Sequence, residues 1–299
     1  MDVLSPYRRE LLTHCYRMLG SVHDAEDLVQ ETMLRAWRAY DSFEGRSTLR
    51  TWLYRIATTQ CLTALESRAR RPLPAGLGGP SDAGGEPLEV REEVPWLEPL
   101  PTGDPAEVVT SRESTRLAFV AALQHLPARQ RAVLILRDVL AWRAAEVAEL
   151  LDTTVAAVNS ALQRARAQLD EVAPTPETVV APADKRELLE RYVEAFERKD
   201  VDAIVALLAQ DAVWEMPPYA TWFLGREQVA RHLDKQCPGG PGDFEFVHTQ
   251  ANGEPALAMY LWGKPFCVQT LTVEGTLFSH VVSFFEPRLF GTFGLPLGL

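Results

Sequence analysis

A run of polar side chains near the middle of the chain has residue types that could recognise DNA. Its members are Thr154, Asn159, Ser160, Gln163, Arg164 and Arg166. Hydroxyl, amide and guanidinium groups that project from one helix can reach base edges in the major groove and the phosphates beside it. The predicted chemistry is therefore recognition through hydrogen bonds. A helical hairpin with an ordinary polar surface would show the same spacing, so the rest of the chain must decide.

Two short helices joined by a polar turn are predicted to position these side chains, over residues 143–169. Val147, Ala148 and Leu151 share one face of the first helix. Apolar residues of the second recur at steps of three and four, the period of an amphipathic helix: Val155, Val158, Leu162, Ala165 and Leu169. Thr153 or Thr154 can cap the second helix through its hydroxyl. The polar set then faces outward.

Composition predicts a multidomain cytoplasmic protein. The chain has 299 residues, of which 46% are hydrophobic, enough for more than one core. It has no apolar run of about 18 residues, and its first residues lack the order of a signal peptide, so no membrane association is expected. The cysteines are far apart and form no CxxC pair: Cys15, Cys61, Cys237 and Cys267. We expect no disulfide framework, metal or cofactor.

The net charge of −11 is unevenly distributed. Residues 72–115 carry two basic and nine acidic side chains, whereas residues 46–71 carry six basic side chains and one acidic. A local positive charge of this kind suits phosphate contacts. The overall negative charge would still repel DNA, so the isolated chain should bind DNA weakly and need a partner.

Three helices are predicted in the first 70 residues. The second buries a seam that runs from Ala25 to Tyr40, and displays a polar face: Glu26, Asp27, Gln30, Glu31 and Arg35. A loop follows, with Ser42, Phe43, Gly45 and Ser47. The third helix and the residues after it offer hydroxyls and arginines: Arg50, Arg55, Thr58, Thr59, Arg68, Arg70 and Arg71. Aromatic and basic groups beside a flexible loop suit single-stranded DNA.

Two long motifs give the chain a specific resemblance. The stretch DAEDLVQETMLRAWRAYDSFEGRSTLRTWLYRIATTQCLTALESRARR resembles region 2 of extracytoplasmic-function sigma factors, which are specificity subunits of bacterial RNA polymerase. The stretch LPARQRAVLILRDVLAWRAAEVAELLDTTVAAVNSALQRARAQL is similar to their region 4. Together they cover roughly residues 7–171. The resemblance implies that the helix-turn-helix reads the −35 element and the N-terminal helices the −10 element.

The resemblance also assigns roles to the polar sets above. Glu26, Asp27, Gln30, Glu31 and Arg35 would bind the clamp of the largest polymerase subunit, and region 4 would bind the flap. Ser42, Phe43 and Ser47 would capture a flipped base. The arginines and threonines of the third helix would line the melted −10 region. Opening a promoter requires strand separation by binding energy, so no catalytic residue is expected.

Some positions depart from the family pattern. Thr59, Gln60 and Thr63 stand where many members have Asn, Arg and Asp, and Asn159 and Ala161 stand where arginines are common. Each missing bidentate guanine contact is worth about 1 to 3 kcal/mol of discrimination. The class is therefore better defined than any promoter sequence.

A stretch rich in Pro, Gly and acidic residues, 72–115, reads as a disordered or extended linker between the two DNA readers. About 40 residues could span roughly 130 Å. Some 25 base pairs separate the two promoter elements by roughly 85 Å. Within the linker, Trp96 and Leu97 are too apolar for a spacer, and we expect them to dock on a neighbouring domain.

A second Pro-rich linker, residues 172–183, precedes a C-terminal domain at 184–299 with a different pattern. Two helices are followed by a strand, another helix and four β-like runs, which predicts an α+β domain. The order resembles the cone-shaped SnoaL-like fold, and some sigma factors carry such a domain fused at their C-terminus. That resemblance implies an apolar pocket with these wall residues: Trp214, Met216, Tyr219, Trp222, Phe223, Tyr260 and Trp262. Glu215, His248 and His280 are its candidate polar groups.

The sequence thus predicts a multidomain chain. Its parts are an all-α sigma region 2 at 1–71, a helix-turn-helix region 4 at 116–171, and a C-terminal domain that regulates them and could bind a small molecule. The apolar tail from Phe284 should pack on the sigma core or on Trp96. Two alternatives stay open. A one-component regulator would bind duplex DNA without polymerase, and an isomerase-like or cyclase-like enzyme would use Asp211 or Glu215 as its acid or base.

Overall fold

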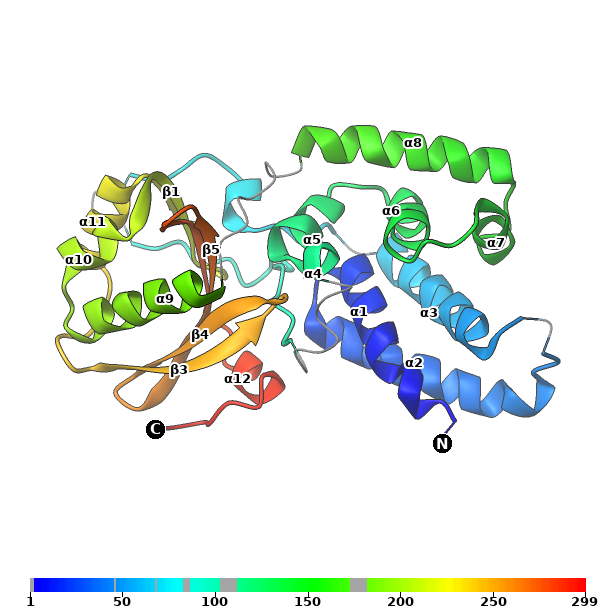
Figure 1. Ribbon diagram of the computed structural model, residues 1–299, viewed down its shortest axis with the longest axis horizontal. Coiled ribbons are helices and arrows are strands. Elements are labelled where there is room, and N and C mark those ends of the chain that lie inside the picture. The colour runs from blue at the N-terminus through cyan, green and yellow to red at the C-terminus, as the bar shows by residue number, and fades with distance from the viewer. Residues whose placement is uncertain (1–2, 46, 68, 83–86, 103–111, 173–181) are drawn as a thin grey trace. The chain divides into compact units, whose positions relative to one another are not determined.

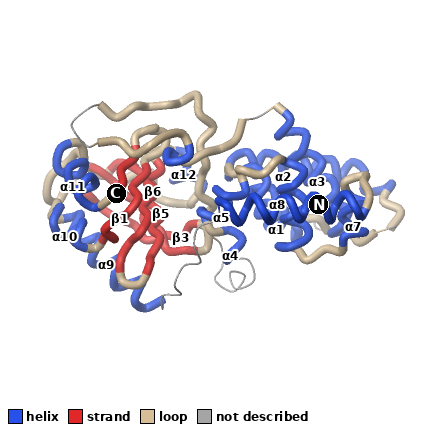
Figure 2. The backbone as a smooth tube through the Cα atoms, turned by 90° about the horizontal axis from the view of Figure 1, so that it is seen from above, coloured by secondary structure: helices blue, strands red, loops and turns tan. Residues whose placement is uncertain are grey.

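The computed structural model describes the chain except for residues 1–2, 46, 68, 83–86, 103–111 and 173–181 (Figure 1). Two compact units are present. The first comprises residues 1–71 and 111–174, and the second comprises residues 72–110 and 175–299. Strands occur in the second unit, and the first is helical (Figure 2). Across the described residues, no helix is both long and apolar enough to cross a membrane.

Three long helices begin the first unit: α1 (Arg8–Leu19), α2 (Val22–Ala39) and α3 (Leu49–Glu66). Gly20 ends α1 with a φ of 71°, a left-handed conformation that favours glycine. The Ser21 and Thr48 hydroxyls cap α2 and α3 by accepting the N–H of Asp24 and of Thr51. The three helices pack around side chains such as Leu11, which are fully buried.

The same unit continues with α4 (Arg112–Thr115), at the end of the predicted linker. The helices of the predicted second DNA reader follow: α5 (Leu117–Leu123), α6 (Ala128–Leu134), α7 (Ala144–Leu150) and α8 (Val155–Val172). A π-helical turn, Ile135–Val139, extends α6. Arg131 of α6 is 4% exposed and links the two halves of the unit. Its guanidinium donates to the carbonyl of Met18 at the end of α1 and to the Gln124 side chain. Its burial is therefore compensated by hydrogen bonds.

The second unit is a curved six-stranded sheet with α9 to α11 on one side. Its elements are α9 (Pro182–Glu197), α10 (Val201–Ala206), β1 (Leu208–Glu215), β2 (Trp222–Leu224), α11 (Arg226–Lys235), β3 (Phe244–Ala251), β4 (Glu254–Leu261), β5 (Lys264–Glu274), β6 (Leu277–Phe284) and α12 (Arg288–Thr292). The strand order is β2-β1-β6-β5-β4-β3. Only β1 and β6 are parallel neighbours. Register shifts in β4–β5 and β5–β6 help the sheet to curve.

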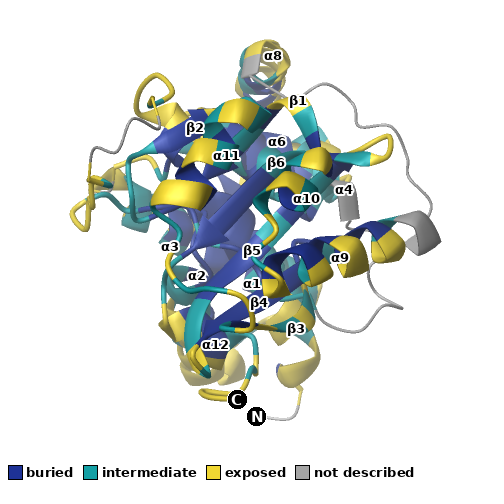
Figure 3. Ribbon diagram, turned by 90° about the vertical axis from the view of Figure 1, so that its left-hand side faces the viewer, coloured by how far each residue is buried: buried dark blue, intermediate teal, exposed yellow. Residues whose placement is uncertain are grey.

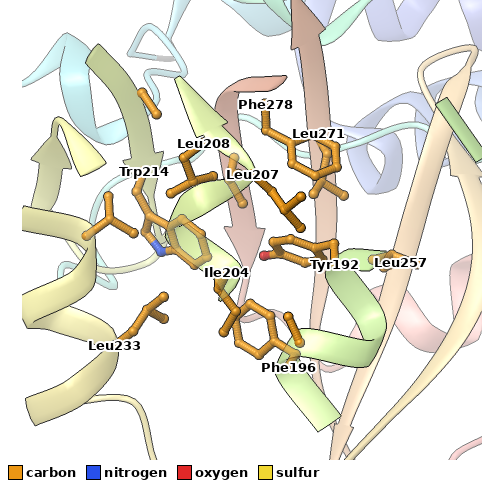
Figure 4. Close-up of a cluster of buried hydrophobic side chains, with 14 of the residues drawn as sticks. Tyr192, Phe196, Ile204, Leu207, Leu208, Trp214, Leu233, Leu257, Leu271 and Phe278 are labelled. Carbon is orange, nitrogen blue, oxygen red and sulfur yellow. The ribbon is translucent and has the colours of Figure 1, made fainter. Parts of the chain in front are cut away.

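Aromatic side chains from helices and strands fill the space between the sheet and α9 to α11. Tyr192, Phe196 and Trp214 lie in this cluster, with Ile204 and Leu233 beside them (Figure 4). The rings of Tyr192 and Phe278 meet edge to face, with centroids 5.3 Å apart. The strands around this cluster are mostly buried (Figure 3). The predicted α+β fold of the C-terminal domain is confirmed.

Residues 72–102, within the first linker of the sequence, pack on this sheet as part of the second unit. We call the described part of this stretch the connecting segment. It follows β2, where Ser81 donates its N–H to the Trp222 carbonyl, and later reaches the β3–β4 turn, where Leu100 and Asn252 exchange hydrogen bonds. Leu97 returns to the start of the segment, because its N–H donates to the Pro72 carbonyl at 3.0 Å. The linker is therefore folded back on itself rather than stretched.

The apolar tail packs on its own domain. Leu289 and Phe290 of α12 are fully buried, and the Phe290 ring lies edge to face with Tyr260 of β4. The Tyr260 hydroxyl donates to the Pro296 carbonyl at 2.8 Å, and the Leu299 N–H donates to the Gly263 carbonyl.

Three details of the sequence interpretation were wrong. Trp37 and Tyr40, placed in the buried seam of α2, are exposed: Trp37 lies two turns after the exposed Gln30 on the same helix face, and Tyr40 lies in the turn that follows the helix. Val155, placed on the inner face of α8, is also exposed because it occupies the first position of the helix. Strand β2 was missed, since it has only three residues.

Candidate nucleic-acid interfaces and the cavity beside the connecting segment

Helix α8 presents the predicted polar set on its exposed side. Thr154, Asn159, Ser160, Gln163, Arg164 and Arg166 are all exposed. Thr154 caps the helix, since its hydroxyl accepts the Ala157 N–H at 3.1 Å. Arg166 makes two hydrogen bonds, of 2.8 and 2.7 Å, to the Asp138 carboxylate. Asn159, Ser160, Gln163 and Arg164 are the remaining members that point from one helix face to solvent.

The arginines predicted to contact the −10 element are held by other parts of the first unit. Arg50 of α3 donates to Glu10 at 2.8 Å. Arg55 donates to the Glu149 carbonyl at 3.0 Å, and Glu149 is the residue before the end of α7. Arg70 lies 2.9 Å from a ring nitrogen of His125, and Arg71 pairs with Asp24. Arg68 lies outside the described residues.

Two of these contacts join the N-terminal helices to the region 4 helices. They are Arg55 with Glu149 and Arg70 with His125. His125 is exposed, but local desolvation and the charge of Arg70 lower its pKa, which favours the neutral ring that can accept a hydrogen bond from Arg70. Both arginines would have to exchange a protein partner for a phosphate in order to bind DNA.

Thr58 is a correction to the predicted −10 set. It is fully buried, and its hydroxyl lies 2.9 Å from Nε2 of the buried His14. Burial, reinforced by the charges of Arg17 and Arg50, lowers the pKa of His14 to about 3. A neutral histidine therefore bonds to Thr58 inside the helical core, where DNA has no access. Thr59, one residue later, is exposed but its hydroxyl donates to the Arg55 carbonyl.

The loop between α2 and α3 has one ordered aromatic contact. The Phe43 ring packs on the Trp52 ring with centroids 4.9 Å apart. Ser42 and Ser47 are exposed, and their hydroxyls donate to nearby backbone carbonyls. The loop therefore offers an aromatic pair flanked by two hydroxyls, a suitable wall for an unstacked base.

The polar face of α2, predicted to bind polymerase, is at the surface. Asp27, Gln30 and Arg35 are exposed, while Glu26 and Glu31 are half-buried. Arg35 and Glu31 form an i,i+4 ion pair at 2.6 Å. Sequence reasoning missed Leu34 and Trp37 on the same helix, which are 48% and 59% exposed. Two large apolar side chains left in solvent on one helix are the signal that could have found this surface.

Trp96 and Leu97 of the connecting segment are buried, at 9% and 0% exposure. The indole N–H of Trp96 donates to the Arg91 carbonyl at 2.8 Å. Leu100, three residues on, is bound to Asn252 through its N–H and carbonyl. Leu97 is therefore buried three residues before the point at which the connecting segment is bound to the β3–β4 turn.

A cavity of about 270 Å³ lies in the second unit, between the sheet and its helices. Three predicted pocket residues line it: Trp214, Met216 and Tyr219. Four others do not. Phe223 stacks on the His232 ring with centroids 4.6 Å apart, and Trp222 donates its indole N–H to the Gly78 carbonyl of the connecting segment. Tyr260 bonds to the tail, and Trp262 is 62% exposed in the β4–β5 turn.

The predicted polar groups lie outside this cavity. His248 and Asp211 are exposed. Glu215 is 1% exposed; its Oε1 accepts the Ala75 N–H of the connecting segment at 3.2 Å, and its Oε2 lies 3.8 Å from His280 Nε2. The buried carboxylate thus holds the connecting segment. Among the described residues, no cluster of His, Cys, Asp and Glu could hold a metal ion.

Three family models match the chain. Residues 3–71 match Sigma-70 region 2, residues 116–169 match Sigma-70 region 4, and residues 189–286 match the SnoaL-like domain. The ECF RNA polymerase sigma factor SigG of Mycobacterium tuberculosis is 56% identical over 305 residues, which cover 97% of this chain and 82% of SigG. SigJ of the same species is 33% identical over 275 residues, with 86% and 80% covered.

A solved structure has the same arrangement of folds. The crystal structure of the M. tuberculosis extracytoplasmic function sigma factor SigJ matches with a TM-score of 0.64 and 26% sequence identity, and the match covers 99% of each chain. Both DNA-reader folds and the sheet domain are thus found together in a relative of known structure.

Proposed function

Because the chain belongs to the extracytoplasmic-function RNA polymerase sigma factors, we propose that it directs core polymerase to its promoters under the control of its own C-terminal unit. Region 2 and region 4 of this family imply binding to core polymerase and to promoter DNA. The observation that carries the control is the docking of the connecting segment on the unit that contains the sheet, where Ala75 is bound by Glu215 and Leu100 by Asn252.

Helix α8 is the proposed −35 reader. Asn159, Gln163 and Arg164 are exposed on its surface, and amide and guanidinium groups of this kind bind adenine and guanine edges in the major groove. Arg166, already held by Asp138, is better placed to contact a phosphate than a base. The −10 element would be bound by α3 and the loop before it, once Arg55 and Arg70 are released from the region 4 helices.

Polymerase would bind the polar face of α2 through its clamp, and region 4 through its flap. Exposed Leu34 and Trp37 extend this face with apolar surface. Polymerase contacts on both halves of the first unit would supply the free energy that separates them, because the overall charge of −11 disfavours DNA binding by the chain alone.

The connecting segment controls the reach between the two readers. While the Leu97 N–H is bonded to the Pro72 carbonyl, residues 72–97 form a closed loop. They then do not lengthen the linker between the two readers. The 19 residues from Leu97 to Arg116 can span at most roughly 60 Å. This is shorter than the roughly 85 Å between the promoter elements. Release of the segment would restore the full linker, so the docked form is the inactive one.

Release of the connecting segment is the test of this proposal. Leu97→Asp places a charge at a fully buried position and should undock the segment, whereas Leu77→Asp changes an exposed leucine of the same segment. Run-off transcription of genomic fragments with core polymerase should rise several-fold for Leu97→Asp and stay at the wild-type level for Leu77→Asp. Equal activity of all three proteins, together with equal activity after removal of residues 184–299, would refute the control.

A substitution that weakens the docking of the connecting segment less than Leu97→Asp should raise transcription less. Asn252 has a φ of 55°, so Asn252→Gly keeps a backbone that glycine tolerates and removes only the side-chain acceptor for Leu100. Its activity should lie between those of the wild type and Leu97→Asp. An electrophoretic assay separates the one-component alternative, which requires tight binding to duplex DNA without polymerase.

We further infer that the C-terminal unit binds a molecule rather than converting one. The described residues around the cavity include no Asp, Glu, Lys or Arg, and His232, which does line it, has a pKa lowered by burial. General acid–base catalysis needs a group poised near neutral pH. Turnover of a small substrate by the purified chain would contradict this inference.

A further inference from the structure

The cavity in the second unit is closed partly by the connecting segment itself. Leu88 lines it together with Trp214, Met216, Tyr219 and Phe285. The residues after Leu88 are fixed to the loop that carries Tyr219. Glu89 accepts the Ala220 N–H at 2.8 Å, and Arg91 donates its N–H to the Pro218 carbonyl at 2.9 Å. Any molecule in the cavity would therefore lie against the connecting segment.

One buried donor in the wall has no acceptor. Trp214 is 3% exposed, and its indole Nε1 has no hydrogen-bond partner in the part of the chain that the structure describes. Its nitrogen is turned toward Leu233, which lines the same cavity (Figure 4). A buried N–H without a partner is costly, so the position favours a bound acceptor.

Two other polar side chains of the wall, Gln269 and His232, are hydrogen-bonded within the protein. Gln269 accepts the Tyr192 hydroxyl at 3.2 Å and donates to the Ser283 hydroxyl at 2.9 Å. His232 lies 2.9 Å from the Gln236 amide oxygen, and its pKa is lowered by burial. The wall thus has no charged group among its described residues to balance an ion, and an unpaired charge would be expensive to bury.

The volume of the cavity limits the size of the molecule that it can bind. At a share near that of liquid water, roughly 30 Å³ for each non-hydrogen atom, the cavity holds a molecule of about ten such atoms. A single substituted ring fits this space. Aromatic and sulfur-containing side chains, such as Phe266 and Met259, line the rest of the wall and suit a ring.

We propose that the cavity binds a small, neutral, mostly apolar molecule whose carbonyl or hydroxyl oxygen accepts the Trp214 N–H, and that its binding stabilises the docked connecting segment. The molecule would act as a co-inhibitor, because it buries Leu88 against itself and so favours the form in which the segment is docked. The regulatory part of this inference rests on the proposed control by the connecting segment, whereas binding does not.

Three probes of similar size separate the requirements: acetophenone, which is neutral with a carbonyl; ethylbenzene, which is neutral without an acceptor; and benzoate, which is charged. Saturation-transfer NMR on the full chain at millimolar concentration should rank acetophenone about tenfold above ethylbenzene, the size of one hydrogen bond, with no transfer from benzoate. Equal transfer from acetophenone and ethylbenzene, binding of benzoate, or no transfer from any probe would overturn the ligand class.

Two variants place the molecule. Trp214→Phe should abolish the preference for acetophenone over ethylbenzene while ethylbenzene still binds, which also shows that the cavity remains folded. Leu88→Ala should weaken acetophenone several-fold, and Leu77→Ala, an exposed leucine of the same segment, should not. A preference that survives in Trp214→Phe would contradict the assigned acceptor site.

Hydrogen exchange reports the coupling. Acetophenone should slow exchange of the Arg91 and Leu100 amides, which are hydrogen-bonded in the docked segment. Unchanged exchange in the presence of bound acetophenone would refute the coupling. If acetophenone slows exchange but Leu97→Asp leaves transcription unchanged, the control fails and the binding stands. If Leu97→Asp raises transcription but no probe binds, only the ligand site fails.

Discussion

Helices α3 and α8 carry the two sets of side chains proposed to contact promoter DNA, and they differ in what holds those side chains. On α8, Asn159, Gln163 and Arg164 are exposed. On α3, Arg50 is bound by Glu10, and Arg55 by the backbone of α7. The proposed −35 side chains are exposed to solvent, whereas the proposed −10 arginines are bound within the protein.

The difference indicates an order of events. Arg55 and Arg70 are bound by Glu149 and His125 of the region 4 half of the first unit, so the proposed −10 surface would become available once the two halves separate. The −35 helix needs no such change in its own contacts. We therefore expect that most of the free energy needed to separate the two halves goes into releasing the arginines of the N-terminal reader.

The largest effect is expected when the buried contact that Arg131 makes between the two halves of the first unit is removed. Arg131→Met leaves the Met18, Gln124 and Leu126 carbonyls without their donor. The loss should be about 3 to 4 kcal/mol, since these carbonyls stay buried. Hydrogen exchange of α6 amides measures it. Arg129→Met, an exposed arginine on the same helix, is the matched control and should stay within about 0.5 kcal/mol.

The inner face of α3 can be tested through pH. His14 has a folded pKa of about 3, far below the usual value near 6.5 for an unfolded chain, because it is buried beside Thr58 and two arginines. The unfolded state therefore takes up the proton first as pH falls, and stability present above pH 6.5 is lost between 6.5 and about 3. Between pH 7 and pH 5 the loss should be about 2 kcal/mol.

Exchange of α1 and α3 amides at pH 7 and pH 5 gives this loss. The His14→Gln variant should show a smaller loss over the same interval, and His248→Gln, at an exposed histidine of the other unit, is the control. An equal loss of stability in wild type and His14→Gln would show that another titrating group causes the loss between pH 7 and pH 5.

Direct base recognition by α8 can be tested with two of its glutamines. Gln163 is exposed, whereas Gln168 donates to the His125 carbonyl at 2.8 Å. Gln163→Ala should lower transcription roughly tenfold and relax the preference for one base in the −35 element. Gln168→Ala should leave base preference unchanged. Loss of the same preference in both variants would count against direct readout by Gln163.

The smallest effect is expected at Arg55. Arg55→Ala removes a contact to DNA and also a contact that keeps the two halves together. These changes oppose each other, so transcription should stay within about threefold of wild type, and the salt slope of open-complex formation should fall by about 0.7 to 0.9 for the lost phosphate contact. Arg38→Ala, at an exposed arginine of α2, should leave the slope unchanged.

Local patterns predicted most of the helices and long strands. The apolar steps of α8 after Val155 and the four β-like runs of the C-terminal domain were read correctly, because each depends on a face that meets a core. Thr58 was misplaced for the opposite reason. A small hydroxyl fits either face of an amphipathic helix, and only the position of His14, 44 residues earlier, decides that it points inward.

The sequence determined the kind of protein, since the two DNA readers are encoded in local motifs and a local stretch of the chain suffices to build each helix. Only the tertiary structure decided which surfaces are occupied. The partners of Arg55, Glu215 and Leu97 lie 94, 140 and 25 positions away. Contacts of this kind depend on how packed elements bring distant residues together, and one-dimensional spacing contains no information about that distance.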